Sequence, residues 1–312
     1  MKQCLVYDGS NEGLTQSIGI ILDAPVHAAQ MERFPDGEIG VEVDEGVRGN
    51  DAYIVHSVRP ASVADDVLKL LLLTNAIYRN GAARITAVLP YLPYARQDRR
   101  ISGLEPVGGR LIADVLQSTA IDRVVTLELH NPSLAGFFRI PVENVSTVGL
   151  FVAAVKDAGV DVVVAPDLGA AKLAESYAAA LGLRTAVVHK SRLSGTEVQV
   201  QSIVGDVRAK RPLLVDDIIS TAGTLEAAID ALLRAGCARP VSIAVTHGLL
   251  VGPATERLRR LPLEHLWLTN SIPLPRAELV GTLHVVDIGS LLAEVVRRLH
   301  ENSPVADLLA HR

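Results

Sequence analysis

The segment that decides the fold runs RPLLVDDIISTAGT, residues 211–224. It contains an apolar strand pattern, 213–215, that ends in two carboxylates, Asp216 and Asp217. A short loop with hydroxyl groups and glycine follows, and the apolar spacing of a helix begins at Leu225. A buried strand that turns through such a loop into a helix is typical of an α/β protein with a parallel sheet.

The same alternation of strand and helix patterns extends outward from this segment. Short apolar runs rich in Val and Ile predict strands over 52–55, 84–89, 124–127, 162–165, 185–188, 269–275 and 284–286. Apolar residues spaced near 3.6 predict helices over 65–78, 108–116, 170–181, 224–233 and 290–300. The pattern indicates a doubly wound α/β architecture in which each sheet is largely parallel and flanked by helices.

Both halves of the chain show this rhythm. The best boundary lies near 141–149, so the sequence predicts one domain over 1–145 and a second over 146–312. A length of 312 residues suits two domains that each bury a core. The rhythm is consistent with an ancient duplication, although no residue-level repeat demonstrates one.

Composition argues against several classes of protein. The content of 49% hydrophobic residues disfavours disorder, and a formal net charge of −5 disfavours a nucleic-acid coat or a binder of anionic membranes. The two cysteines, Cys4 and Cys237, lie too far apart for a disulfide framework or a Cys-rich metal site. The start of the chain does not resemble a signal peptide, and the richest apolar stretch, 67–78, is too short to cross a bilayer. We therefore expect a cytoplasmic protein with no nucleic-acid or membrane partner.

The loop in the deciding segment suits a phosphorylated sugar. In open α/β sheets, ligands lie at the carboxyl ends of strands, where loop N–H groups and a helix N-terminus can hold a phosphate. Two neighbouring carboxylates can also accept hydrogen bonds from sugar hydroxyls. A furanose with a 5-phosphate uses both features, and the simpler interpretation is a capped strand–turn–helix junction. The candidate residues are Asp216, Asp217, Ser220, Thr221, Ala222, Gly223 and Thr224.

This segment resembles the phosphoribosyl-diphosphate fingerprint of type I phosphoribosyltransferases and of ribose-phosphate diphosphokinases. Three further motifs resemble the diphosphokinase family over nearly the whole chain: FPDGE at 34–38, YLPYARQDRR at 91–100, and ELH at 128–130 followed by GFF at 136–138. A phosphoribosyltransferase is usually nearer the length of one half of this chain and lacks these elements. The resemblance implies two tandem type I phosphoribosyltransferase-like domains.

The activity that this resemblance implies is transfer of the diphosphoryl group of ATP to the C1 hydroxyl of ribose 5-phosphate. The products would be 5-phosphoribosyl 1-diphosphate and AMP. The implied ATP contacts are Phe34, Asp36, Gly37, Glu38, Arg96, Gln97, Asp98 and Arg99. In the family, Phe34, Asp36 and Glu38 serve the nucleotide site of a neighbouring subunit. We therefore expect a homo-oligomer, specifically a hexamer. The chain has no Walker-type phosphate loop, and Arg99 is equally well explained as a solvated loop charge.

The expected cofactor is Mg²⁺, for which the resemblance implies contacts from His130, Asp167 and Glu128. Imidazole is an unusual Mg²⁺ ligand, so contact between His130 and the ATP phosphates is the alternative. Asp167 precedes a predicted helix and also fits a helix N-cap. Lys190 and Arg192 resemble the paired cations of the family's flexible catalytic loop. There they would neutralise charge that builds on the reacting phosphate oxygens.

Several positions depart from the family pattern. Ser220 and Ala222 stand where Asp and Gly are usual, and Ala222 fits only if its position does not require a positive φ. Ser191 replaces an Arg, Glu128 replaces an Asp, and Arg139 replaces an acid. The STAGT loop looks more like that of the archaeal-type branch of the family.

Two other functions remain open. A phosphoribosyltransferase would consume the same product, and the long N-terminal half with Arg96 and Gln97 disfavours it. A non-catalytic regulatory subunit could share the fold. Because such a subunit would be free to lose Lys190, Arg192 and the paired acids, their presence disfavours that alternative.

Overall fold

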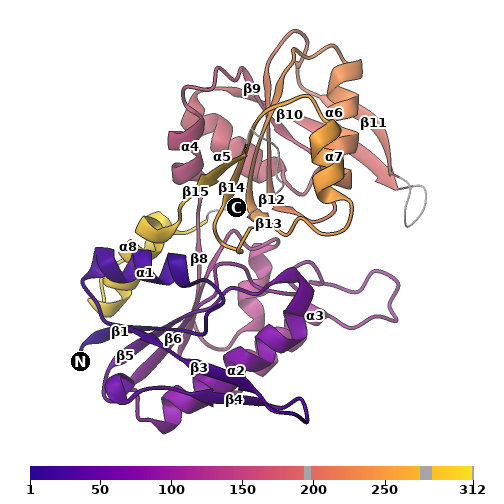
Figure 1. Ribbon diagram of the computed structural model, residues 1–312. Coiled ribbons are helices and arrows are strands. Elements are labelled where there is room, and N and C mark those ends of the chain that lie inside the picture. The colour runs from indigo at the N-terminus through magenta and orange to yellow at the C-terminus, as the bar shows by residue number, and fades with distance from the viewer. Residues whose placement is uncertain (193–197, 275–282, 311–312) are drawn as a thin grey trace. The chain divides into compact units, whose positions relative to one another are not determined.

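The protein forms two compact units, each built around one sheet (Figure 1). The computed structural model describes residues 1–192, 198–274 and 283–310, without the side chains of 190–192 and 198–201. The first unit contains 1–146 and also takes 271–273 and 287–310 from near the end of the chain. The other described residues belong to the second unit.

The first unit has a six-stranded sheet in the order β2-β1-β5-β6-β7-β8, and every neighbouring pair is parallel. Its strands are β1 (Gln3–Tyr7), β2 (Val26–Ala28), β5 (Asp51–Val55), β6 (Arg84–Val88), β7 (Arg123–Leu127) and β8 (Val142–Val145). An antiparallel hairpin pairs β3 (Gln30–Arg33) with β4 (Ile39–Glu42). The helices are α1 (Glu12–Leu22), α2 (Val63–Arg79), α3 (Gly108–Leu116) and α8 (Gly289–His300), with short 3-10 turns at Glu45–Val47, Pro60–Ser62, Pro132–Phe137 and Ala306–Leu308.

The second unit has a seven-stranded sheet in the order β11-β10-β9-β12-β13-β14-β15. All neighbouring pairs are parallel except β10 with β11. The strands are β9 (Val162–Ala165), β10 (Arg184–Arg192), β11 (Val198–Val204), β12 (Pro212–Ile219), β13 (Val241–Gly248), β14 (Leu263–Thr269) and β15 (Leu283–Val286). The helices are α4 (Val148–Val155), α5 (Ala171–Leu181), α6 (Gly223–Arg234) and α7 (Ala254–Arg260).

Both faces of the second sheet are covered, as its continuous apolar strands predict. Leu213 and Val215 of β12 pack in one core with Phe151 of α4 and Tyr177 of α5. Leu214, between them, packs in the core that contains the buried side chains of α6 and α7. Because successive side chains of a strand point to opposite faces, a strand buried on both faces needs an unbroken apolar run. The prediction of helix-flanked, largely parallel sheets is confirmed.

The last described helix returns to the first unit, whereas the sequence placed all of 146–312 in one domain. Helix α8 packs against α1, and its last residue, His300, reaches the sheet. His300 Nδ1 lies 2.8 Å from Oδ2 of Asp51, a fully buried carboxylate that also accepts hydrogen bonds from Arg84 and from Tyr53. Although burial opposes it, these partners lower the pKa of Asp51. The helix thus supplies both apolar cover and a partner for a buried charge.

Three expected strand boundaries differ from the structure. The strand predicted over 213–215 extends to Ile219, because β13 pairs with it as far as Gly248. The strand predicted to end at Val188 continues to the end of β10 and pairs with β11, with a register shift between His189 and Lys190. The strand predicted over 269–275 is wrong for 270–274, and residue 275 lies outside the described residues. There β14 ends at Thr269 and the chain crosses to the first unit, and Pro273 cannot donate to a sheet.

Within the described ranges, no helix is both long and apolar enough to cross a membrane.

Candidate active site

The second sheet reverses its direction of winding between β9 and β12. From β9 the chain continues outward to β10 on one side, and from β12 it continues to β13 on the other. Ligands of open α/β sheets bind at such a switch point, beyond the carboxyl ends of the strands. Strand β9 pairs with β12 only as far as Leu214, so the last residues of β12 lie beyond the end of β9. The STAGT loop, residues 220–224, begins where β12 ends.

Three carboxylates lie at the carboxyl ends of the two strands that flank this switch point. Asp216 and Asp217 lie in the last part of β12, and Asp167 follows β9. Burial raises the pKa of Asp216 well above its usual range, and the charges of Asp217 and Asp167 raise it further. Asp217 is 7% exposed, and its backbone N–H donates to Oδ1 of Asp216 at 2.9 Å. Mutual repulsion of this kind favours a site that receives sugar hydroxyls or a cation.

Asp167 also orders the turn before α5. Its Oδ1 accepts hydrogen bonds from the backbone N–H groups of Gly169, at 2.9 Å, and Ala170, at 3.3 Å. The N-cap of α5 is Ala170, which makes no side-chain capping bond, so the interpretation of Asp167 as the N-cap is wrong and its side chain instead orders the preceding turn. The turn brings the first N–H groups of α5 to the same sheet edge as the paired acids.

The STAGT loop adopts the conformation that its sequence seemed to oppose. Ala222, the residue before α6, has φ 60° and ψ 5°, which is left-handed backbone. The loop therefore requires a positive φ at a position where the family usually has Gly, and Ala carries a conformational cost there. The Ala222 side chain is 4% exposed and packs in the core with Leu225, which offsets part of that cost.

Sequence reasoning missed one residue at this loop. Arg257 of α7 donates a hydrogen bond from Nη1 to the backbone carbonyl of Thr221 at 2.9 Å, although 36 residues separate them. In the sequence it stands in the charged run ERLRR, residues 256–260, which is typical of a solvated helix face. No signal in the local sequence marks it, because only the packing of α7 beside α6 brings it to the loop.

Lys190 and Arg192 lie at the carboxyl end of strand β10 rather than in a loop. Their backbones pair with Val200 and Val198 of β11. Their side chains lie outside the described part of the chain, so the interpretation of them as catalytic cations stays a prediction. The segment 193–197, which the sequence assigned to the same catalytic loop, is also outside the described residues.

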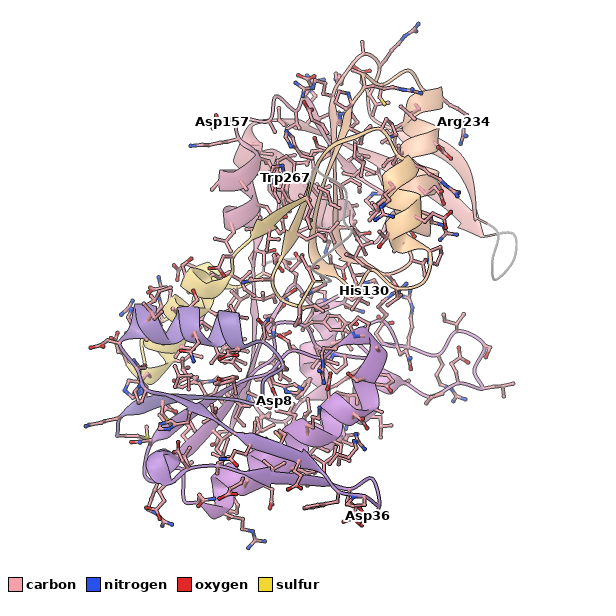
Figure 2. The ribbon with its side chains drawn as sticks, viewed as in Figure 1. Asp8, Asp36, His130, Asp157, Arg234 and Trp267 are labelled. Atoms are coloured by element: carbon pink, nitrogen blue, oxygen red, sulfur yellow. The ribbon has the colours of Figure 1, made fainter. Side chains whose placement is uncertain are left out.

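In the first unit, the FPDGE motif forms the tip of the β3–β4 hairpin, where Figure 2 labels Asp36. Phe34 is 42% exposed, and its backbone N–H donates to the carbonyl of Glu38 at 2.9 Å. Gly37 has φ 95°, which suits glycine, and its carbonyl accepts a hydrogen bond from Arg33. The hairpin therefore presents an aromatic ring and two exposed carboxylates, those of Asp36 and Glu38, to the outside of this unit.

The structure brings the YARQDRR and ELH motifs together. Asp98 Oδ2 accepts a hydrogen bond from the side chain of Asn131 at 2.6 Å, next to the exposed His130. These segments follow β6 and β7, which are neighbours in the sheet, so their carboxyl ends meet at one edge. Arg96, Gln97 and Arg99 are exposed there, and Figure 2 labels His130.

Glu128 differs from the other predicted metal contacts because it is 1% exposed. It has φ 39°, and its Oε1 accepts a hydrogen bond from the hydroxyl of Ser146 at 3.1 Å. Its burial and this hydrogen bond set Glu128 apart from the exposed His130.

The first sheet has its own switch point, between β1 and β5, and it is filled by protein. Asp8 follows β1 and His56 follows β5, and both side chains are almost fully buried, with Oδ2 and Nδ1 3.0 Å apart. Although burial opposes it, His56 lowers the pKa of Asp8. The Ser57 N–H donates to the hydroxyl of Ser10 at 3.0 Å, which ties the two strand ends together. The two sheets therefore differ at equivalent positions, and only the second carries the acid pair and STAGT loop.

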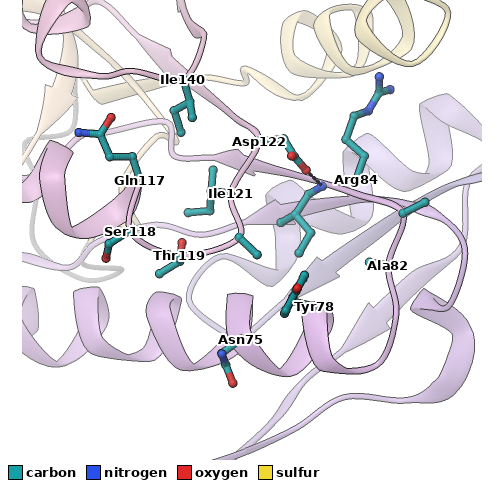
Figure 3. Close-up of a pocket in the computed structure, with 13 residues that line it drawn as sticks. Asn75, Tyr78, Ala82, Arg84, Gln117, Ser118, Thr119, Ile121, Asp122 and Ile140 are labelled. Carbon is teal, nitrogen blue, oxygen red and sulfur yellow. Dashed lines mark hydrogen bonds between the residues drawn. The ribbon is translucent and has the colours of Figure 1, made fainter.

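A cavity of about 620 Å³ in the first unit lies apart from these residues (Figure 3). Arg84, Ile85 and Asp122 line it at the amino ends of β6 and β7, the edge opposite to that of His130. Asp122 Oδ2 accepts a hydrogen bond from Ile85 N–H at 2.8 Å, and Gln117 bonds to Asp114. Its polar groups are thus engaged in the fold, and we assign it no part in the candidate site.

The folds of the two units define a class: α/β proteins with phosphoribosyltransferase-like domains. Residues 4–119 match the N-terminal domain of ribose phosphate pyrophosphokinase, and residues 196–310 match the phosphoribosyl synthetase-associated domain. A ribose-phosphate pyrophosphokinase of Campylobacter jejuni is 39% identical over 311 residues, which cover 99% of each chain. One of Clostridium acetobutylicum is 35% identical over 312 residues, covering 98% of this chain and 97% of the relative.

A solved structure agrees with these relatives. The crystal structure of phosphoribosylpyrophosphate synthetase from Mycobacterium smegmatis has a TM-score of 0.90 and 36% identity, and the match covers 97% of this chain and all of that one. The chain therefore belongs to the ribose-phosphate pyrophosphokinase family. The family that the sequence motifs indicated is confirmed, whereas the resemblance of its loop to the archaeal-type branch stays a prediction.

Proposed function

We propose that this chain transfers the diphosphoryl group of ATP to the C1 hydroxyl of ribose 5-phosphate. The products are 5-phosphoribosyl 1-diphosphate and AMP. Family membership supports this activity, and one structural observation supports the choice of particular residues for the sugar site. The acid pair of β12, Asp216 and Asp217, precedes a loop with left-handed backbone at the open switch point of the second sheet.

In this proposal the second unit holds the sugar. Asp216 and Asp217 accept hydrogen bonds from the ribose hydroxyls, and the backbone and hydroxyl groups of Ser220, Thr221, Ala222, Gly223 and Thr224 hold the 5-phosphate. Thr221 and Thr224 are exposed, which supports their use by a ligand. The N-terminus of α6 adds a favourable dipole for the phosphate dianion.

The ATP contacts belong to the first unit in this proposal. Arg96, Gln97 and Arg99 are exposed beside His130, and Asp98 fixes their segment through Asn131. Phe34, Asp36, Gly37 and Glu38 stand on the hairpin, and we propose that they serve the nucleotide site of a neighbouring subunit in a homo-hexamer. We also expect the enzyme to work in the cytoplasm.

Phosphoryl transfer asks the protein mainly for positioning and for neutralisation of charge. The anomeric oxygen forms a bond to the β-phosphorus, the bond to the oxygen of the α-phosphate breaks, and AMP leaves with that oxygen. We propose that Lys190 and Arg192 neutralise the charge on the transferred group and on the leaving oxygen.

The proposed metal is Mg²⁺, which in this reaction would neutralise the phosphate oxygens. Burial, followed by the charges of Asp217 and Asp167, raises the pKa of Asp216, and a cation bound near these carboxylates would relieve the repulsion between them. Among the described residues, no group of three or more His, Cys, Asp or Glu side chains is placed so that it could hold a metal ion, so the proposed ion would depend on oxygens of the substrate and of water. An open site is typical of Mg²⁺, which keeps waters and takes oxygen ligands from the substrate. His130 and Glu128 remain the proposed contacts in the first unit.

One assay tests the activity. Purified protein is incubated with ATP, Mg²⁺ and ribose 5-phosphate, and AMP release is followed. Production of AMP that depends strictly on the sugar supports the proposal, whereas ADP formation or no turnover contradicts it. A phosphoribosyltransferase would instead consume 5-phosphoribosyl 1-diphosphate, and a regulatory subunit would show neither reaction.

The assignment of Lys190 is tested with a substitution. We expect Lys190→Ala to reduce kcat by a factor of about 100 or more, the usual effect of removing one group that stabilises transition-state charge. Unfolding of the variant should match that of the parent. Lys210→Ala is the control, because Lys210 pairs with Asp206 at the surface. Near-normal turnover of the Lys190 variant would remove this residue from the catalytic role.

A further inference from the structure

Arg257 joins three parts of the second unit at the STAGT loop. It lies on α7, and its Nη1 donates to the carbonyl of Thr221 in the loop at 2.9 Å. Its Nε lies 3.0 Å from Oε2 of Glu226 in the first turn of α6. Both side chains are about one-third exposed, at 33% and 34%. The planar guanidinium therefore bonds the loop with one nitrogen and the following helix with another.

The contact to Thr221 also sets the direction of a backbone N–H. In a planar trans peptide, the carbonyl and the N–H of the next residue point in opposite directions. The carbonyl of Ser220 accepts a hydrogen bond from Val251 N–H at 3.0 Å, and that of Thr221 accepts from Arg257. The N–H of Thr221 therefore points away from Val251, and the N–H of Ala222 points away from Arg257.

Ala222 and Gly223 have the backbone arrangement of an anion-binding concavity. Successive N–H groups form such a concavity when left-handed and right-handed backbone conformations alternate; Ala222 is left-handed at φ 60°, and Gly223 begins the right-handed helix α6. The carbonyl of Ala222 is committed to α6, because it accepts from Glu226 N–H at 3.0 Å. With three successive carbonyls engaged, the loop leaves one side on which its N–H groups can face a phosphate.

We propose that Arg257 is a positioning residue for the 5-phosphate of ribose 5-phosphate, a role that rests on the proposed function. It acts by holding the Thr221 carbonyl out of the phosphate site, so that the N–H groups of the loop face the anion. Its proposed role is indirect, because the two contacts described for its side chain are with the Thr221 carbonyl and with Glu226. Gly223 allows the approach, because a Cβ at that position would lie 3.2 Å from Nη1 of Arg257.

The same helix supplies a matched control. Arg260 forms an exposed ion pair with Glu256, so it has the same chemistry as Arg257 but no contact with the loop. If α7 only needs surface charge, removing either arginine should have the same effect. If the loop contact matters, only the substitution of Arg257 should alter the sugar site.

The experiment compares Arg257→Ala, Arg257→Lys and Arg260→Ala with the parent enzyme. We expect Arg257→Ala to raise KM for ribose 5-phosphate by about tenfold, as expected for loss of a hydrogen bond from a charged donor. The value of kcat and KM for ATP should stay within about twofold, since neither depends on where the loop carbonyl points. Arg257→Lys should be almost as impaired, because a single ammonium cannot replace the two-nitrogen bridge. Arg260→Ala should match the parent.

Binding of ribose 5-phosphate is also measured by calorimetry without ATP, which separates this inference from the proposed function. If the parent binds the sugar phosphate but makes no AMP, the proposed activity fails while a tenfold weaker Kd in Arg257→Ala still supports the positioning role. An unchanged KM and Kd in Arg257→Ala would overturn the inference. So would a parent that does not bind ribose 5-phosphate, or a variant that loses kcat, both KM values and thermal stability together.

Discussion

Asp216→Asn should stabilise the second unit while it removes the sugar site. The parent carries a partly exposed carboxylate whose pKa is raised by desolvation and by the charges of Asp217 and Asp167. Two unit charges about 6 Å apart repel by about 3 kcal/mol at an effective dielectric constant of about 20. Asparagine has no charge, and its side-chain oxygen can still accept the N–H of Asp217 that Asp216 accepts. We expect a gain of about 1–2 kcal/mol at pH 8, since Asp216 is partly exposed and water screens part of that repulsion.

The gain should depend on pH in a defined direction. In the folded chain Asp216 has a higher pKa than in the unfolded chain, so the folded state holds a proton more tightly. Above the raised pKa the parent bears the whole penalty. As the pH falls through that pKa, the folded parent takes up a proton and the penalty fades, and it is gone below the ordinary carboxyl pKa of about 3.9. The advantage of the variant should therefore be greatest at pH 8 and small near pH 4.

The chain offers a specific probe for this measurement. Trp267 of β14, which is labelled in Figure 2, is the single tryptophan of the sequence. It is 5% exposed and belongs to the second unit. Its fluorescence in urea therefore follows unfolding of that unit. Asp206→Asn is the control, because Asp206 is exposed and its pKa is lowered by Lys210. A destabilised Asp216→Asn, or a gain that does not change between pH 8 and pH 4, would refute the electrostatic reasoning.

Two further substitutions test the first unit. Asp51→Asn should lower the free energy of unfolding by about 3 kcal/mol, because it leaves the Arg84 guanidinium beside a neutral group in the core. Asp114→Asn is the control and should change the free energy of unfolding little, because Asp114 belongs to an exposed ion pair. Hydrogen exchange measures both, and equal effects of the two substitutions would contradict this prediction. Gly108→Ala should raise KM for ATP by about fivefold, the effect of losing one ordinary hydrogen bond, because a Cβ there would lie 2.3 Å from Oε1 of Gln97. Gly13→Ala, which meets open space, is its control in the same kinetic assay.

The sequence predicts the existence of most elements because their apolar patterns are strong and local. The continuous runs at 162–165 and 213–215 must be buried on both faces, and only a parallel sheet covered by helices provides that. The ends of strands are decided elsewhere. Residues 216–219 include two carboxylates and look like the end of a strand, but β13 supplies hydrogen-bond partners as far as Gly248. The pattern over 290–300 predicts a helix correctly, although an apolar face does not indicate which unit it covers.

The candidate site was predictable to the same degree. The carboxyl ends of neighbouring parallel strands meet, so acids that follow β9 and lie at the end of β12 come together, as Asp167 and Asp216 do. The left-handed conformation of Ala222 was not predictable, because alanine disfavours it and only the packing around the loop enforces it. Arg257 was not predictable either, since its contact with Thr221 depends on how α7 lies beside α6.

The return of α8 to the first unit has a consequence for biosynthesis. Residues 1–146 leave the ribosome long before 287–310. Helix α1 therefore lacks its packing partner, α8, while the intervening chain is translated. The second unit has the described residues of its sheet complete by Val286, before α8 emerges. We therefore expect the inserted unit to be finished first and the amino-terminal unit last. A nascent chain that stalls near its carboxyl terminus would then leave the first unit, rather than the second, incomplete and prone to aggregation.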